Sequence, residues 1–403
     1  MTAPPPVNPA ASLPPPLNIP SSNSTVRVTI VDSTARLGNI PSHLFFQPDI
    51  PGKSTLDCAS YTFLIEHSGS SGGSTTGTKK YMFDLSMRKD WTNLVPKNVE
   101  GIKAGGWTLD IKKNVSEVLE EGGVRLEEID GIFLSHHHGD HIGDPSTFPS
   151  STDLIVGPGW KKELLPGYPA NPDSSVLESD YAGRTLREID FSEQGKGNFK
   201  IGRFNAFDFF GDGSFYLLDS PGHAPGHMCG LARTTRDTFI LMGGDLAHHG
   251  GQFRPSQYVP LPDQISPNPL MDTKRVPNAP PCPGHLFEAI HPQKTGSAPF
   301  YHITTGKEGR GKIAFDPVKH QDSLEKLEDL DAWPENVFVI IAHDPILRQK
   351  EHMQHLQDTV ELFPKGDANL WKEKGWAAPI RWSFLGEFKE AVELKQKEAD
   401  LTA

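Results

Sequence analysis

Histidine and aspartate side chains are concentrated in residues 135–141, whose sequence is SHHHGDH. Imidazole nitrogens and carboxylate oxygens together are the ligands of zinc and of similar divalent metal ions. His136 and His138 lie two residues apart, so on extended chain their side chains point the same way and can share one ion. Asp140 and His141 follow where the chain turns at a glycine, and they can reach a second ion beside the first. This stretch therefore predicts a metal site.

An apolar run, residues 131–134, precedes this stretch and is typical of a short buried strand. The spacing His136-x-His138-x-Asp140-His141 that follows it resembles the signature of the metallo-β-lactamase superfamily. The resemblance implies three further ligands, namely a histidine in a Pro-Gly-His turn, an aspartate after a later strand and a histidine after another. The residues of this chain that match them are His223, Asp245 and His343.

The resemblance implies two metal ions, zinc above all, held by seven side chains. The first ion would be held by His136, His138 and His223. The second would be held by Asp140, His141 and His343. Asp245 would bridge the two ions, and a water shared between them would supply the hydroxide that attacks a substrate carbonyl. Asp140 is the expected catalytic residue, because it would orient this nucleophile and move a proton.

The same resemblance implies an α/β fold, a four-layer αβ/βα sandwich. Apolar and alternating patterns predict its strands, which are residues 26–32, 61–66, 80–85, 131–134, 153–156, 199–210, 215–218, 238–242 and 337–341. Helical patterns predict helices over residues 110–121, 160–165 and 322–331, the first of them capped by Asp110. The metal ligands follow strands in both halves of this arrangement.

Composition divides the chain into a tail, a domain and an extension. Residues 1–25, rich in proline and serine, are expected to form a disordered tail, and residues 26–346 the metallo-β-lactamase-like domain. Within that domain, residues 250–311 are rich in proline and glycine and predict an inserted loop over the active site. Residues 347–403 are expected to form a helical extension that packs on the body. Its predicted helices are 347–362 and 384–401.

The formal net charge is −12, which argues against nucleic acid as a partner because phosphate binding needs clustered cationic side chains. The three cysteines provide no disulfide framework and suit a reducing compartment. No run approaches the ~18 apolar residues of a membrane span, and the N-terminus lacks the basic and apolar regions of a signal peptide. These features predict a cytoplasmic protein that acts on a small molecule.

Five residues near the motifs have more than one interpretation. Asp84 ends a predicted strand, and it either matches the family's supporting aspartate or caps a turn. His137 should point away from the ligands, and His227 should brace the turn in which it lies. Cys229 is interpreted as a small buried apolar residue. His248 stands where lactonases of bacterial signal molecules carry a tyrosine that helps to hold the carbonyl, and it could still donate a hydrogen bond.

These features favour a metal-dependent hydrolase that opens a cyclic ester or amide, that is, a lactonase or lactamase. The alternative is a thioester hydrolase, of the glyoxalase II kind or acting on carrier-bound polyketide chains. Its anionic substrates would need a basic patch, for which Lys161, Lys162 and residues 307–312 are the nearest candidates. A scaffold protein without activity would require a broken ligand set, and all seven ligand positions are intact.

Overall fold

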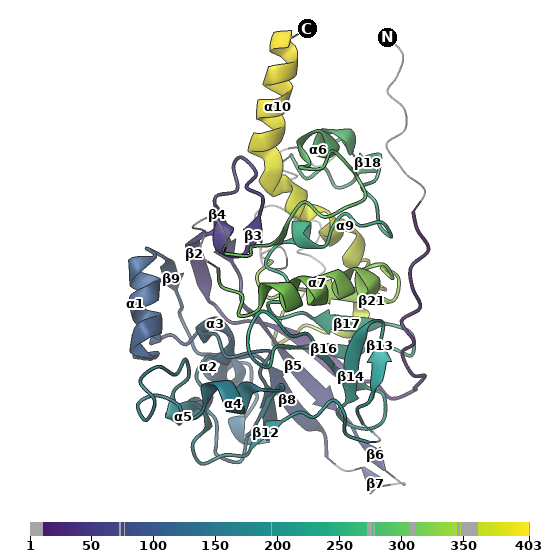
Figure 1. Cartoon of the computed structure of the whole chain (residues 1–403). Coiled ribbons are helices and arrows are strands. Elements are labelled where there is room, and N and C mark those ends of the chain that lie inside the picture. The colour runs from purple at the N-terminus through teal and green to yellow at the C-terminus, as the bar shows by residue number, and fades with distance from the viewer. Residues whose placement is uncertain are drawn as a thin grey trace.

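Two six-stranded sheets packed face to face form the body of the protein (Figure 1). The structure is a computed structural model. It describes residues 11–402 apart from 72–73, 76, 195, 272–275, 277–278, 307–311, 345–346 and 348–361.

The first sheet has the strand order β1-β5-β8-β10-β11-β12. Its strands are β1 (Arg27–Asp32), β5 (Tyr61–His67), β8 (Lys79–Phe83), β10 (Ile129–Phe133), β11 (Asp153–Val156) and β12 (Leu186–Glu188). The first three are antiparallel, and β8, β10, β11 and β12 run parallel to one another. The carboxyl ends of β8 and β10 therefore lie side by side, and the predicted ligand stretch begins at this edge.

The second sheet has the order β13-β14-β15-β16-β17-β21 and is antiparallel except for its last pair. Its strands are β13 (Phe199–Ile201), β14 (Phe204–Asp208), β15 (Phe215–Asp219), β16 (Met228–Arg233), β17 (Phe239–Met242) and β21 (Val337–Ile340). Because β17 and β21 are parallel neighbours, the residues that follow them, including Asp245 and His343, leave the sheet at the same edge.

Helices cover the outer face of each sheet, and apolar side chains fill the space between the sheets. Alternate residues such as Phe63, Phe133 and Phe215 face this interior. The helices α2 (Val115–Glu121) and α4 (Trp160–Leu164) pack on the first sheet, and α7 (Pro317–Asp331) packs on the second (Figure 1). The predicted αβ/βα sandwich is therefore confirmed.

A separate apolar core lies outside the sandwich, in what we call the side lobe. The side lobe combines residues 35–58, 87–111, 261–301 and 382–392. Its main elements are β2 (Arg36–Pro41), β4 (Thr55–Cys58), β9 (Thr108–Asp110), α1 (Pro96–Ala104), α6 (His285–Ile290), η8 (Ser383–Phe388) and α10 (Lys389–Thr402). The short strands β3 (Phe46–Gln47), β18 (Gln264–Ile265) and β19 (Cys282–Pro283) also belong to the side lobe. Short elements elsewhere in the chain are α3 (Gly139–Ile142), α5 (Glu178–Tyr181), α9 (Ala377–Arg381), β6 (Ser70–Ser71), β7 (Ser74–Thr75) and β20 (His302–Ile303).

Several predicted boundaries differ from the structure. The helix expected over 110–121 begins at Val115, because Asn114 forms a capping box with Glu117 and Asp110 ends a strand. The described part of the segment 250–311 is not a bare loop, since it contributes Leu261, Phe287 and other residues to the side-lobe core. Residues of the predicted helix 347–362 lie almost entirely outside the described residues.

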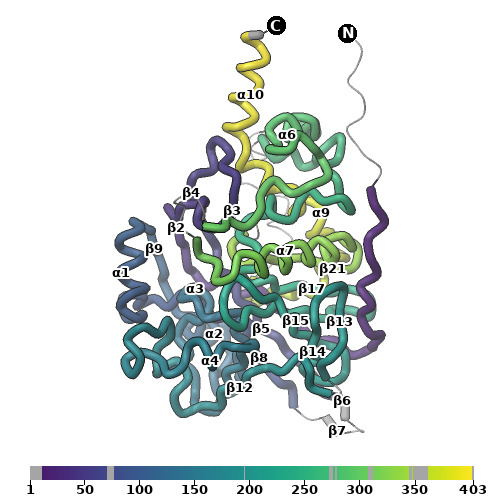
Figure 2. The backbone as a smooth tube through the Cα atoms, in the orientation of Figure 1, coloured from purple at the N-terminus to yellow at the C-terminus, as the bar shows by residue number. Residues whose placement is uncertain are grey.

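The N-terminal segment from residue 11 to residue 25 is not the disordered tail that its composition suggests. It runs along the body (Figure 2), where Leu17 is buried and its carbonyl accepts the amide of Gly202 at 2.7 Å. The carbonyl of Pro15 accepts the indole N–H of Trp333 at 3.0 Å. These contacts hold a segment whose own composition provides no helix or strand pattern.

The C-terminal extension contacts the core between the sheets and the core of the side lobe. Trp371 and Trp376 enter the core between the sheets, Phe384 and Phe388 enter the side lobe, and α10 then extends away from the body (Figure 2). The division of the chain at residue 346 stays a prediction. Among the described residues, no helix is both long and apolar enough to cross a membrane.

A buried ion cluster links the insertion, α7 and the extension. Arg254 donates to Asp331 at 2.6 and 3.0 Å, and Arg381 donates to the same carboxylate at 2.7 Å. Burial by itself would raise the pKa of Asp331, but the two guanidinium groups hold this pKa below its ordinary value.

We expect Asp331→Asn to lower the free energy of unfolding by about 3–5 kcal/mol at pH 7, because two buried cations lose their counter-charge. A carboxylate with a depressed pKa in the folded state stabilises above its unfolded pKa, and this contribution is lost as the pH falls through the folded value. The difference in unfolding free energy between the wild type and Asp331→Asn should therefore narrow below about pH 4. Urea unfolding at several pH values measures it. Asp322, which forms an exposed ion pair with Lys326, provides the control. Asp322→Asn should lower the free energy of unfolding by at most about 1 kcal/mol.

Candidate metal centre

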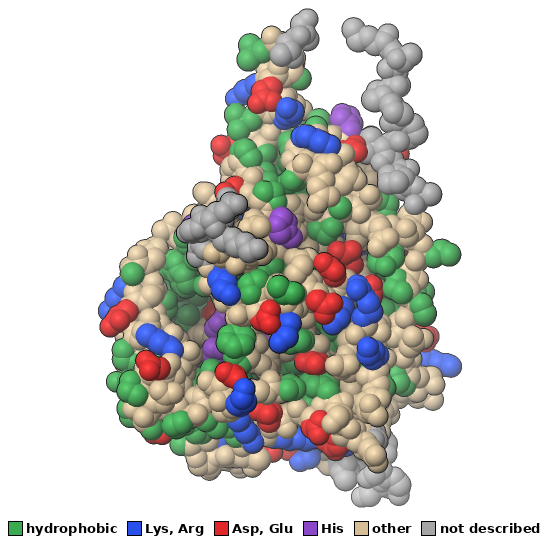
Figure 3. Space-filling view, viewed as in Figure 1, with side chains coloured by type: hydrophobic (Ala, Val, Ile, Leu, Met, Phe, Trp, Pro, Cys, Tyr) green, Lys and Arg blue, Asp and Glu red, His purple; other side chains and the backbone are tan. Residues whose placement is uncertain are grey.

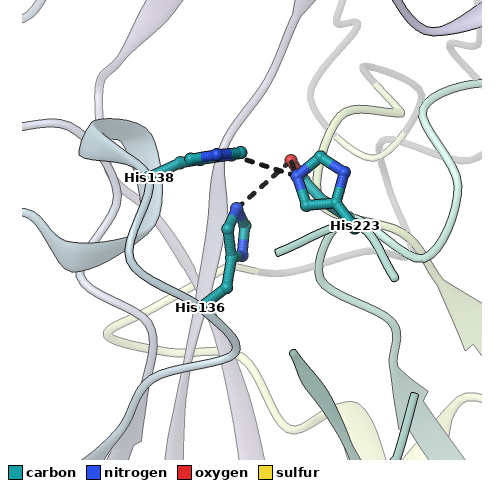
Figure 4. Close-up of side chains that lie close together, drawn as sticks. His136, His138 and His223 are labelled. Atoms are coloured by element: carbon teal, nitrogen blue, oxygen red, sulfur yellow. Dashed lines mark hydrogen bonds and ion pairs between the residues drawn. The ribbon is translucent and has the colours of Figure 1, made fainter. Parts of the chain in front are cut away.

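The predicted ligand stretch leaves β10 at its carboxyl end and turns into the short helix α3. His136 lies in the loop, and His138 is the residue that precedes α3. The rings of His136 and His138 point toward the ring of His223, which comes from the turn between β15 and β16 (Figure 4). The Nδ1 of His138 lies 3.0 Å from the Nε2 of His223. Three histidines from two sheets therefore share one point.

The carboxylate of Asp245 lies at the middle of the cluster and is 2% exposed. Its Oδ2 lies 3.1 Å from the Nε2 of His223 and 3.5 Å from the Nε2 of His136. Its Oδ1 lies 2.9 Å from the Nε2 of both His141 and His343. One carboxylate oxygen thus faces one group of histidines, and the second oxygen faces another group.

The structure brings all seven predicted residues together. In each of two groups, the candidate ligand atoms lie within 4.8 Å of one another. The first group is His136, His138, His223 and Asp245. The second is Asp140, His141 and His343, and it adjoins Oδ1 of Asp245. The Oδ2 of Asp140 lies 3.5 Å from the Nε2 of His343.

Asp84 braces the second group from behind. Its carboxylate accepts the amide N–H and the hydroxyl of Ser135, each at 2.7 Å, and the Nδ1–H of His141 at 2.8 Å. The Nδ1 of His343 donates in the same way to the carbonyl of Ala59 at 2.7 Å. With Nδ1–H donated outward, the Nε2 of each ring faces the centre. This arrangement favours the supporting role for Asp84 over that of a turn cap.

His227 and His137 do not join the cluster. The Nε2 of His227 accepts the backbone N–H of Asp245 at 3.1 Å, and its Nδ1 donates to the carbonyl of Ser220 at 3.0 Å. The ring therefore fixes the strand-end loop that carries the central aspartate. His137 belongs to neither group of candidate ligands.

The electrostatics of the cluster suit cation binding. Burial lowers the pKa of His136 and His223, and it lowers the pKa of His138 to about 4, so these rings are neutral and their lone pairs are available. Burial alone would raise the pKa of Asp245, but the surrounding histidines, His141 first, hold it well below its ordinary range. The centre is therefore an ionised carboxylate ringed by imidazoles.

The donor set passes a simple test for metal binding. The Nε2 of His136 is buried and has no hydrogen-bond partner, although it points at the shared centre. Such an atom is costly unless something binds it. Nitrogen and carboxylate ligands at this spacing fit a borderline divalent cation.

A cavity of about 270 Å³ opens directly on the cluster. His138, Asp140, Asp245 and His343 line its floor. Its walls are mostly apolar side chains of the side lobe, among them Phe45, Met87, Leu94, Ile102 and Trp107. Figure 3 shows a hollow with hydrophobic side chains beside α1.

The wall differs from the sequence prediction. The described residues of the segment 250–311 do not line this cavity; they pack behind its wall, where Tyr301 contacts Phe46 at 4.3 Å between ring centroids. The two tyrosines Tyr258 and Tyr301 both line a separate surface groove, and neither lines the cavity above the cluster. Trp107 and Phe45 were not predicted, because an apolar side chain has no chemical signature in one sequence.

Comparison with known proteins gives a consistent result. Residues 105–343 match the family model for the metallo-beta-lactamase superfamily. The chain is 47% identical over 380 residues to a γ-lactamase of Fusarium pseudograminearum, an alignment that covers 93% of this chain and 86% of that protein. It is 42% identical over 385 residues to a metallo-hydrolase of Annulohypoxylon moriforme, with 94% and 92% covered.

Among solved structures, an N-acyl homoserine lactone hydrolase with the product N-hexanoyl-L-homoserine at its catalytic metal centre superposes with a TM-score of 0.50. The two chains are 14% identical, and the superposition covers 85% of this chain and 99% of the other. At this identity the likeness concerns the fold alone.

The brace at Asp84 leads to a prediction about metal affinity. We expect Asp84→Ala to weaken metal binding about 10–100-fold, because His141 loses the partner that fixes its tautomer and ring orientation. Titration of the metal-free protein with zinc against a competing chelator measures this. Asp130, whose carboxylate accepts hydrogen bonds from Lys79 and Lys80 on the same sheet, provides the control. Asp130→Ala should leave the metal affinity unchanged. An unchanged affinity in Asp84→Ala would contradict the supporting role.

Proposed function

The chain belongs to the metallo-β-lactamase superfamily and is a hydrolase of that family, and from this premise we propose that it opens the ring of a small lactam. A lactone is the related second substrate class. The observation that carries the proposal is the position of the ionised Asp245 between two groups of histidines at the floor of an apolar cavity. The kinship to a γ-lactamase favours the cyclic amide over the cyclic ester.

We propose two zinc ions per chain as the cofactor. His136, His138 and His223 would hold the first, Asp140, His141 and His343 the second, and Asp245 would bridge both. Bound zinc would lower the pKa of a water toward neutrality and polarise a carbonyl.

The side chains of the cavity supply binding, orientation and proton transfer. The apolar wall would hold the ring and exclude bulk water, so that the substrate carbonyl faces the cluster at the floor. Asp140, whose side chain is 22% exposed and lines the cavity, would accept a proton from the attacking water at Oδ2. As the new C–O bond forms and the C–N bond breaks, it would return that proton to the leaving nitrogen.

The alternative of a thioester hydrolase has less support from the cavity. Thioesters of coenzyme A, glutathione or a carrier protein are long and anionic, and the cavity is small. Among the described residues that line it, Lys97 is the one lysine or arginine. Of the candidate basic patch, Lys161 and Lys162 lie on α4 and do not line the cavity, and residues 307–311 lie outside the described residues. A small uncharged ring fits these walls better.

The metal content of the protein tests the proposed cofactor. Elemental analysis of zinc-replete protein should give about two zinc ions per chain, because ligands of suitable type form two adjoining groups. Asp245→Asn should lower this number, since Asp245 is shared by both groups. A stoichiometry of zero in replete wild-type protein would contradict the proposed centre.

The second prediction tests the reaction. Zinc-loaded protein should hydrolyse members of a panel of lactams and lactones faster than acyl thioesters of similar size. We expect His223→Ala and Asp245→Asn to reduce kcat/KM by more than about 100-fold while the proteins stay folded, because misplaced reacting groups cost at least this much. The exposed His302 provides the control, and His302→Ala should behave as wild type. Preferential thioester turnover would favour the alternative.

A further inference from the structure

His248 lies in contact with the metal cluster but outside the seven predicted ligands. It is 3% exposed, and its Nε2 lies 3.1 Å from Oδ2 of Asp245. Its ring lies between the two ligand groups, 5.0 Å from the ring of His223 and 5.4 Å from that of His343. A residue in this place can bind metal, contact the substrate or position the carboxylate.

Contact with the substrate is disfavoured by Phe45. The ring of Phe45 covers His248 at a centroid distance of 4.3 Å, and Phe45 lines the cavity whereas His248 does not. The imidazole is therefore behind the cavity wall. His248 stands where the lactonases carry a tyrosine that holds the carbonyl, but in this chain its side chain faces Asp245.

The loop itself fixes the position of His248. The backbone N–H groups of His248 and His249 both donate to Oε1 of Gln252, at 2.6 and 3.1 Å. Gln252 is 1% exposed. Because these bonds lie within the protein, the backbone at His248 is held in place before any substrate enters.

The second nitrogen of His248 bears on which tautomer its ring adopts. Asp245, His248 and His343 could together hold an ion by distance alone. Firm Nδ1 partners such as those of His141 and His343 do not separate ligands from other histidines here, because Nδ1 of the predicted ligand His223 also lacks a hydrogen-bond partner. The Nδ1 of His248 is buried and has no hydrogen-bond partner, so a proton there would be unsatisfied. The tautomer that donates Nε2–H to Asp245 avoids that cost.

We propose that His248 is a positioning residue, which orients the Asp245 carboxylate between the two ligand groups through its Nε2–H. The proposal rests on the proposed function for the identity of the centre, but its test does not require turnover. If His248 has this role, the substrate carbonyl must be held by groups other than His248.

The test compares two variants of similar size that differ in the donor. His248→Leu removes the N–H, and His248→Gln keeps one on the side chain. Zinc titration of the metal-free proteins against a competing chelator should show affinity about 10–100-fold weaker in His248→Leu, as for the loss of other groups that orient metal ligands. His248→Gln should recover most of the affinity. If His248→Leu does not fold, as judged by circular dichroism, His248→Ala replaces it.

His249 is the matched control, because it is equally buried in the same loop and its ring contacts Phe384 and Phe388 instead of the cluster. His249→Leu should therefore keep the affinity of the wild type. Equal losses in His248→Leu and His248→Gln would overturn the proposal in favour of ligation. Unchanged affinity with a raised KM would overturn it in favour of substrate contact. Absence of lactam turnover in every protein would contradict the proposed function and leave the affinity comparison valid.

Discussion

A buried negative charge is the constraint on which this structure depends. Removing a carboxylate from water is costly unless cations or hydrogen-bond donors compensate for the lost hydration. Asp245 is nearly inaccessible, and it is surrounded by imidazoles from β10, from the β15–β16 turn and from the end of β21. The two sheets must therefore meet with these edges aligned, and the apolar interior between them sets that alignment.

The residues around the ligands limit where each one can move. Asp84, the carbonyl of Ala59 and His227 each bond a ligand or its backbone, and these partners come from strand ends of both sheets. Orientation of the ligands is thus built from β-sheet edges instead of flexible loops. Precision of this kind is what metal-assisted hydrolysis needs, because reacting groups must be placed within fractions of an ångström.

Sequence reasoning predicted the ligands and the sandwich because both depend on local patterns. Contiguous histidines identify a site, and apolar runs such as residues 131–134 identify buried strands. The predicted strand over 199–210 is two strands, since Gly202 turns the chain with φ +54°. β16 was not predicted, and neither was α1, whose buried face is limited to Val99 and Ile102. The side lobe could not be predicted, because its core joins four segments that are far apart in the chain.

The separation of the cavity wall from the ligand shell has an evolutionary consequence. The reacting centre is specified by strand ends of the sandwich, whereas the shape that meets the substrate is specified by the side lobe, including Phe45, Leu94 and Trp107. Substitutions in the lobe can therefore retune substrate range without disturbing bond-breaking chemistry. Related proteins could therefore acquire new cyclic substrates by substitution in the side lobe, while selection keeps the strand-end residues of the centre unchanged.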